Sequence, residues 1–225
     1  MEGLRKKFSI WALILVAVSL LVLSVGIGFD SSGVGPQGRA ADLYLKIIHG
    51  NGDGRVEAET GLRWLGVSAM PTITNYLSHR DSWLRSTARA LLEKQTFVKI
   101  TIHDKFAYRS MARQGVQIIG TNAGPALVSM FRYSPIDYVE EDNPAYLAAK
   151  CLVNLGPPAI LALVGGLTNG NARIRALSAM TITMSSNVRH SSVVPGLVRC
   201  AGDTNAEVRA AAVFALGRVM ENPEL

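Results

Sequence analysis

Apolar residues recur at helical spacing through most of this chain. Near the C-terminal end, Val208, Ala211, Ala212, Ala215 and Leu216 follow the i, i+3, i+4, i+7, i+8 rule of one helix face. Few stretches alternate between apolar and polar side chains, as half-buried strands would. The pattern predicts an all-α fold built from small and aliphatic side chains, and it argues against a large β-sandwich or barrel.

The helical pattern also repeats along the chain. Residues 172–180 (ARIRALSAM) align with residues 206–214 (AEVRAAAVF) at a spacing of 34 residues. Residues 82–92 carry the same aliphatic-Arg step followed by small residues, and weaker copies begin at Tyr108 and Tyr146. A regular spacing of this length is typical of helical arrays in which each unit packs on the next.

Several copies are followed by a turn with glycine and proline, and then by a second apolar stretch. The clearest case is Gly156 with Pro157 and Pro158; similar turns occur near residues 65–73, 120–128 and 191–198. Glycine suits the positive φ at the end of a helix, and proline suits the first turn of the next one. The sequence therefore predicts pairs of antiparallel helices.

These motifs resemble those of the HEAT-repeat family, whose units have a D-x-x-x-x-V-R step. Residues 203–209 match this step completely, whereas residues 169–175 and 79–85 have Asn and His in place of Asp. The resemblance covers about residues 56–220. It looks closest to bacterial proteins that carry such repeats behind one N-terminal membrane helix.

The resemblance implies an α-solenoid of about four to five HEAT-like helix pairs over residues 43–225. In each pair the D-x-x-x-x-V-R step opens the first helix, and the proline lies near the second helix. One pair is expected to be degenerate. Leu84 and Tyr108 occupy the same motif position in successive copies, and the 24 residues between them are too few for a complete helix pair. Residues 97–102 fit either a short strand or a distorted helix, and residues 133–144 read as an inserted acidic loop.

The N-terminal segment has a different character. Residues 8–28 are 21 consecutive uncharged residues, preceded by Arg5, Lys6 and Lys7. A helix of this length spans about 31 Å, which matches a bilayer core of about 30 Å. We therefore expect a transmembrane helix or signal anchor at 8–28, with a basic cytoplasmic N-terminus at 1–7.

The same expectation places the rest of the chain outside the cytoplasm. Residues 29–42 are predicted to form a flexible tether and a short segment leading into the repeats. The repeat domain at 43–225 would then be periplasmic, on a single-pass membrane protein, or secreted if residues 8–28 were cleaved as a signal peptide.

Charge adds one candidate surface to this picture. The chain has 23 basic and 17 acidic residues, a formal net charge of +6. Between residues 80 and 113, eight basic residues stand against three acidic ones, a local excess of 8 − 3 = +5. We call these eight residues the basic surface: Arg80, Arg85, Arg89, Lys94, Lys99, Lys105, Arg109 and Arg113. They are either a docking site for an anionic partner or, at Arg85 and Arg109, structural bridges between neighbouring helices.

Motifs for catalysis or metal binding are not found. The four histidines are far apart in the sequence, and no P-loop, H-E-x-x-H, G-x-S-x-G or C-x-x-C is present. We therefore expect no catalytic residue, no metal site, no cofactor and no small-molecule substrate. Cys151 and Cys200 lie in apolar runs that favour buried thiols, with a disulfide between them as the alternative.

Together these features predict a membrane-anchored helical-repeat scaffold or adaptor, without catalysis of its own, that binds proteins through a concave surface lined mainly by second helices. Two alternatives stay open. One is a cytoplasm-facing repeat protein that binds nucleic acid or acidic partners through the basic surface; the predicted topology argues against nucleic acid. The other is a lyase-like or enzyme-associated HEAT-repeat protein.

Overall fold

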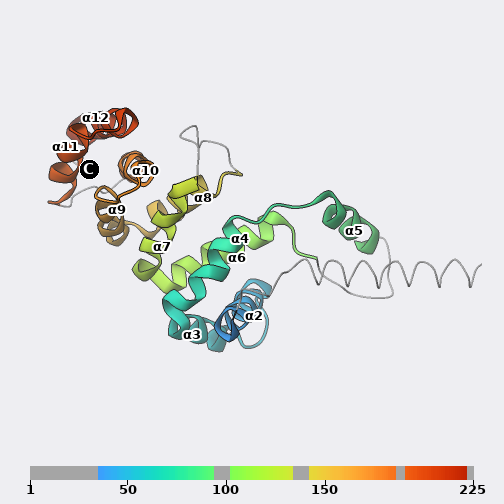
Figure 1. The fold of residues 1–225 in the computed structure, drawn as a ribbon. Helices are drawn as coiled ribbons and strands as arrows, with labels where there is room; N and C mark the ends of the chain where they lie inside the picture. The colour runs from blue at the N-terminus through green and yellow to red at the C-terminus, as the bar shows by residue number, and fades with distance from the viewer. Residues whose placement is uncertain (1–34, 94–101, 134–141, 186–190, 222–225) are drawn as a thin grey trace, which may run out of the picture.

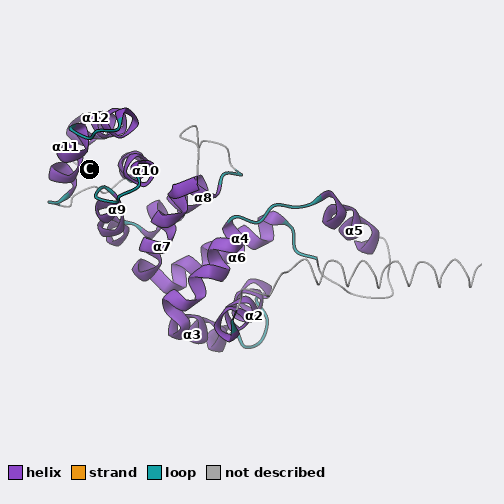
Figure 2. Ribbon diagram, in the orientation of Figure 1, coloured by secondary structure: helices purple, strands orange, loops and turns teal. Residues whose placement is uncertain are grey.

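The computed structural model describes residues 35–93, 102–133, 142–185 and 191–221, and within them it shows helices and no strand (Figures 1 and 2). Four short 3₁₀ turns, η2 to η5, join some of the helices. The α-helices are α2 (Pro36–Gly50), α3 (Arg55–Leu65), α4 (Met70–Leu77), α5 (Trp83–Glu93), α6 (Lys105–Ile119), α7 (Gly124–Ser129), α8 (Pro144–Leu155), α9 (Ile160–Gly166), α10 (Ala172–Met184), α11 (Val193–Ala201) and α12 (Ala206–Glu221). The prediction of an all-α chain is confirmed for these residues.

The helices stack as five pairs, which we call units one to five: α2–α3, α4–α6, α7–α8, α9–α10 and α11–α12. Successive second helices also pack on one another, α6 on α8 and most extensively α10 on α12. The pairing expected from the sequence is therefore shifted by one helix. The D-x-x-x-x-V-R step lies at the turn inside a unit and opens its second helix, whereas the proline lies near the start of the first helix.

The single-pass membrane localisation predicted from the sequence is contradicted. A search of the described residues finds no helix with the length and apolar character needed to cross a bilayer. The segment at 8–28, on which that prediction was based, lies outside the described residues. The tether predicted at 29–42 is described only from Gly35 onward, and there α2 begins at Pro36 and buries Ala41.

Four of the five second helices, α6, α8, α10 and α12, begin at a side chain that accepts hydrogen bonds from free amides of the first turn. The Oδ1 atom of Asn171 accepts from the N–H groups of Arg173 at 2.9 Å and Ile174 at 3.4 Å. The same role falls to Asp104 before α6, Asn143 before α8 and Asn205 before α12. Such caps offset the unpaired N–H groups of a first turn and contribute about 1 kcal/mol each.

Three second helices end at a glycine with positive φ. Gly66, Gly120 and Gly156 have φ of 50°, 69° and 74°, and each is followed by a 3₁₀ turn that leads into the next first helix. Proline occupies one of the first two positions of α4, α7 and η5. The predicted use of Gly156 and its prolines is confirmed, and this turn carries the chain from one unit to the next.

Two arginines bind carboxylates of the following unit. Arg175 on α10 donates from Nε and Nη2 to the two Oδ atoms of Asp203, at 2.7 and 2.8 Å, just before α12. Arg109 on α6 donates from Nη1 to Asp142 at 2.7 Å, just before α8. A two-pronged arginine–carboxylate contact fixes position as well as charge. These contacts set the register between neighbouring second helices.

Small residues let the helices approach closely. A Cβ atom at Gly166 on α9 would overlap Ser178 Oγ on α10 and come within 3.1 Å of Val128 Cγ1. A Cβ atom at Gly124 would lie 2.6 Å from the Cβ of Ala162. The core between the helices is otherwise formed by leucine, isoleucine and alanine side chains, and it runs continuously from α2 to α12.

The copy predicted at residues 82–92 forms a helix, α5, but it does not join the stack. It lies apart from the paired helices (Figure 1), in the connection between α4 and α6. Its Trp83 is 73% exposed, and Trp64 on α3 is 85% exposed. Both tryptophans occupy positions that a helical apolar pattern assigns to the core, yet both are exposed in the structure. Residues 94–101 and 134–141 lie outside the described part of the chain.

Three histidines gather around one tyrosine. The ring centroids of His79 and His103 lie 4.4 and 5.9 Å from that of Tyr108, and His49 lies 6.0 Å from His103. Tyr76 completes the cluster at 4.7 Å from Tyr108. These three histidines, although far apart in the sequence, thus lie together in the fold. Burial, followed by the nearby His49 and Lys46, lowers the pKa of His103.

A matched pair of glycine variants tests the close approach of α9 and α10. We expect Gly166→Ala to lower the free energy of unfolding by about 1–3 kcal/mol, because the new methyl group overlaps Ser178. Gly165→Ala, one residue earlier, meets no atom within 4 Å and should leave stability unchanged or raise it by up to about 1 kcal/mol. Urea unfolding measures both, and equal effects would contradict the packing described.

The histidine cluster predicts a pH dependence of stability. Because the pKa of His103 is lowered in the folded chain, the unfolded chain binds more protons near pH 6 than the folded chain does. The free energy of unfolding is therefore fully retained above about pH 6.5 and falls as the pH drops below that value. We expect the free energy of unfolding to be lower at pH 5.5 than at pH 7.5, and His103→Gln to reduce this difference. An unchanged pH difference in the variant would show that another group is responsible.

Candidate protein-binding surface

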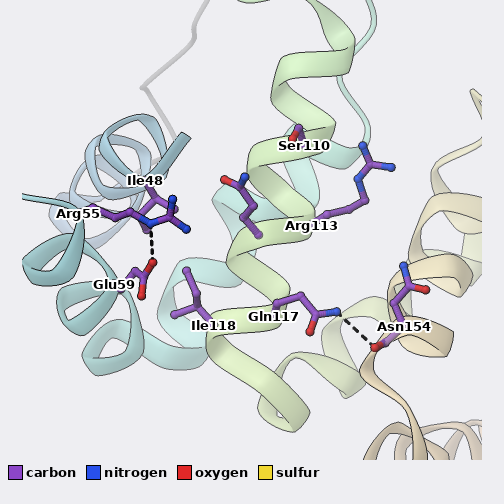
Figure 3. Close-up of a pocket in the computed structure, with 9 residues that line it drawn as sticks. Ile48, Arg55, Glu59, Ser110, Arg113, Gln117, Ile118 and Asn154 are labelled. Atoms are coloured by element: carbon purple, nitrogen blue, oxygen red, sulfur yellow. Dashed lines mark hydrogen bonds and ion pairs between the residues drawn. The ribbon is translucent and has the colours of Figure 1, made fainter. Parts of the chain in front are cut away.

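A groove of about 360 Å³ lies on the second helices of the first three units (Figure 3). Arg55 and Glu59 of α3 form one wall, and Asn154 at the end of α8 forms the other. The floor is α6, and Ile48 of α2 closes one side. Four helices thus line the groove, and the residues involved extend from Ile48 to Asn154 in the sequence.

The floor is a polar stripe on one face of α6. Arg113 and Gln114 follow Ser110 by three and four residues, and Gln117 follows those two by four and three, which places all four along one side of the helix. Ile118 adds an apolar patch beside them. A mixed lining of this kind suits a peptide, whose backbone and side chains present both polar and apolar groups.

The walls of the groove are held in place by hydrogen bonds. Arg55 Nε donates to Glu59 Oε1 at 2.9 Å, and Arg55 also contacts the side chain of Asn51. On the other side, Gln117 Nε2 donates to the backbone oxygen of Asn154 at 3.3 Å (Figure 3). The second of these contacts joins α6 to α8 across the groove.

Two groups of the floor have unused binding capacity. The Oε1 atom of Gln114 is buried and has no hydrogen-bond partner in the described part of the chain. Arg113 is exposed, points away from Arg55 and Glu59 in Figure 3, and makes no ion pair with a described residue. A buried acceptor without a donor costs free energy, so a ligand N–H at Gln114 would be favourable.

Part of the basic surface is bound to one carboxylate. Asp142 accepts hydrogen bonds from Lys105 and Arg109, both at 2.7 Å. Hydrogen bonds from Lys105 and then Arg109 lower the pKa of Asp142 to about 2. Arg109 is almost fully buried, and its Nε and Nη2 atoms have no partner among the described residues. Arg109 therefore connects α6 to the turn that precedes α8.

The other residues of the basic surface are dispersed. Arg89 Nη1 lies 4.0 Å from a carboxylate oxygen of Asp81 and 3.8 Å from one of Asp104. Arg80 follows α4 and is exposed, and Arg113 lines the groove. Arg85 is part of α5, with no description of its side chain, and Lys94 and Lys99 lie outside the described residues. The structure thus unites Lys105 and Arg109 at Asp142 and directs Arg113 to a different site.

Both cysteines are free and buried, so the alternative of a disulfide between Cys151 and Cys200 is not realised. Burial raises the pKa of the Cys151 thiol to about 11. Within the described residues, no group of three or more histidine, cysteine or acidic side chains is arranged to hold a metal ion.

The groove itself was missed by the sequence analysis. The only local signal is the run of polar residues on α6, and such a run normally indicates a solvated helix face. Recognising the site also requires knowledge of which helices lie beside α6. The sequence supplies that only through long-range packing.

One comparison with known proteins agrees with this architecture. The sequence model of the HEAT repeat family matches residues 193–222, which hold α11, the turn at Asp203 and α12. The matched unit therefore starts at a first helix, as the pairing in the structure does. No curated protein and no solved structure matches the chain. The match supports a HEAT-repeat protein, and repeats of this family generally mediate interactions between proteins.

The contact at Asp142 yields a stability prediction. Asp142→Asn should lower the free energy of unfolding by about 1–2 kcal/mol, because it removes the carboxylate that balances the buried guanidinium of Arg109. Lys105→Met removes only the more exposed partner and should cost less than about 1 kcal/mol. Urea unfolding of the two variants checks this order, and a larger loss for Lys105→Met would contradict it.

Proposed function

We propose that this protein is a non-catalytic scaffold or adaptor that holds a segment of another protein in the groove on α3, α6 and α8. The observation that carries the proposal is the polar floor of α6, where, among the described residues, Arg113 has no ion pair and the buried Oε1 atom of Gln114 has no donor. The HEAT repeat supports an interaction role in general, and the groove provides a specific place for it.

The chemistry of the floor indicates which kind of segment fits. Gln114 Oε1 would accept a hydrogen bond from a backbone N–H, and the guanidinium of Arg113 would bind a carboxylate. Ile48 and Ile118 offer apolar contact at the side of the groove. The proposed ligand is therefore an extended segment with an acidic residue next to an apolar one.

The rival functions receive less support from the structure. Docking of nucleic acid or of an acidic protein on the basic surface requires accessible cations, but Lys105 and Arg109 are bound to Asp142 and Arg89 lies between two carboxylates. For a lyase-like function, the residues that line the groove include no histidine, cysteine or lysine.

Photo-crosslinking in cells tests the groove. A photoreactive amino acid placed at Gln117, inside the groove, should capture a discrete partner, whereas the same group at Arg132, which is exposed on the 3₁₀ turn η4, should not. Mass spectrometry of the adduct identifies the captured segment.

A charge reversal in the same experiment distinguishes binding from chance proximity. Arg113→Glu should weaken capture at least about tenfold, equivalent to about 1.4 kcal/mol, because it places a negative charge where the ligand carboxylate is expected. Arg132→Glu has the same charge change outside the groove and should leave capture unchanged. Capture from both positions, or capture that is insensitive to Arg113→Glu, would refute the proposed site.

A further inference from the structure

Two arginines 34 residues apart have the same local conformation. Arg175 Nη1 donates to the backbone oxygens of Asn169 at 2.8 Å and Gly170 at 3.2 Å. Arg209 Nη1 donates to the oxygens of Asp203 at 2.9 Å and Thr204 at 3.0 Å. In both cases the guanidinium is held over the turn that opens its own helix. The two side chains are therefore positioned for the same kind of contact with a following unit.

Among the described residues, Arg175 alone of the two contacts a following unit. Arg175 uses its remaining Nε and Nη2 groups to bind the carboxylate of Asp203, in the next unit. Arg209 is exposed, and its Nε and Nη2 groups have no partner in the described residues. Because its conformation is already fixed, Arg209 would lose little side-chain freedom on binding a carboxylate.

The surface around Arg209 is apolar at the positions that α10 uses for stacking. On α10, Ala176 and Ala179 are buried, and α12 packs on this helix. The equivalent residues 34 positions later are Ala210 and Val213, and both are exposed, Val213 by 60%. The terminal unit of a repeat array usually has a polar outer face. The outer face of unit five instead repeats the stacking surface of unit four.

Phe214 and Met220 enlarge this exposed strip on α12, and they are 53% and 70% exposed. Together with Ala210, Val213 and Gly217 they lie on the side of the helix opposite its buried residues Val208, Ala212 and Ala215. A strip of small and aliphatic side chains beside a positioned arginine is the arrangement that receives a second helix elsewhere in the array.

The other end of the array offers the complementary group. Asp53 directly precedes Gly54, the cap of α3, as Asp142 directly precedes Asn143, the cap of α8. Asp142 binds the arginine of the preceding unit, but no described unit precedes unit one, and Asp53 makes no ion pair with a described residue. Val56 near the start of α3 and Trp64 near its end are both exposed.

From these observations we infer that copies of this chain stack head to tail, with unit five of one copy on unit one of the next and with Arg209 donating to Asp53 across the contact. The junction would continue the register seen between α10 and α12. Contacts of this type do not close by a two-fold axis, so they form rings or open chains of copies.

The test uses the full-length chain and measures its mass in solution by sedimentation over a range of concentrations. The wild-type chain should form oligomers that grow with concentration. Arg209→Asp and Asp53→Arg should each weaken this association at least about tenfold, because each places like charges together at the contact.

Mixing the two variants gives the decisive result. In a mixture of Arg209→Asp with Asp53→Arg, Arg209 of one variant meets Asp53 of the other, and the new carboxylate at position 209 meets the new guanidinium at position 53. Every contact between unlike variants then pairs opposite charges, so association should return toward that of the wild type. Arg132→Asp, with the same charge change in unit three, serves as the control and should associate like the wild type. A monomeric wild-type chain, association that is equal in all variants, or a mixture that associates as weakly as its two components would overturn the inference.

Discussion

The array depends on the turn that joins the two helices of each unit, because this turn starts a helix and also fixes a stack. Asp203 shows both roles in one side chain. Its carboxylate accepts from the N–H of Asn205 at 2.8 Å, within the turn, and from Arg175 of the preceding unit. The hydrogen bonds from Arg175, followed by that from Asn205, lower the pKa of Asp203. Local chain direction and long-range register are thereby coupled.

The equivalent turn before α10 keeps the first role and lacks the second. Asn169 Oδ1 accepts from the N–H of Asn171 at 2.9 Å, so the turn is unchanged. The position on α8 that corresponds to Arg175 is Leu147, which is buried. An asparagine and a leucine at these positions cannot form the ion pair seen between Arg175 and Asp203, and the apolar core continues through units three and four. The two changes match each other, which avoids a buried arginine without a carboxylate.

Local features of this fold could be predicted from the sequence, and the pairing of its helices could not. The glycine and proline at Gly156–Pro157 act over a few residues, so their spacing alone identifies the turn. An apolar stripe, by contrast, shows that a helix is buried but not which neighbour buries it. Apart from α5, each described helix packs on a partner within its unit and on a helix of a neighbouring unit. The D-x-x-x-x-V-R step fits the start of a pair as well as its middle.

Because the sequence does not show which helices become neighbours, it also could not predict that α5 lies outside the stack or that Trp64 and Trp83 are exposed. Residues 82–92 have the motif of a stacked helix, but the second helix of unit two is α6, which packs along α4. The competition between two helices for one place is decided by long-range packing. Trp64 occupies a helical apolar position, yet the side of α3 that carries it has no neighbour among the described residues and is open to solvent.

The candidate site was hidden for a related reason. Arg109 and Arg113 are one helical turn apart on α6 and have the same charge, so the sequence counts them as equivalent. Arg109 lies on the side where Asp142 approaches, and it is buried in that contact; Arg113 faces the groove. The local excess of positive charge was predicted, but its division between structural and accessible cations depends on the path of the chain before α8.

The groove and the proposed head-to-tail contact meet at unit one. Asp53 is two residues from Arg55, which forms a wall of the groove and is held there by Glu59. A copy stacked through Arg209 would therefore place its α12 beside the α3 wall, with Phe214 and Val213 next to exposed side chains of α3. In that arrangement the groove of one copy would continue onto the last unit of another. Binding of a long segment and stacking of copies would then stabilise each other, because each orders the same wall.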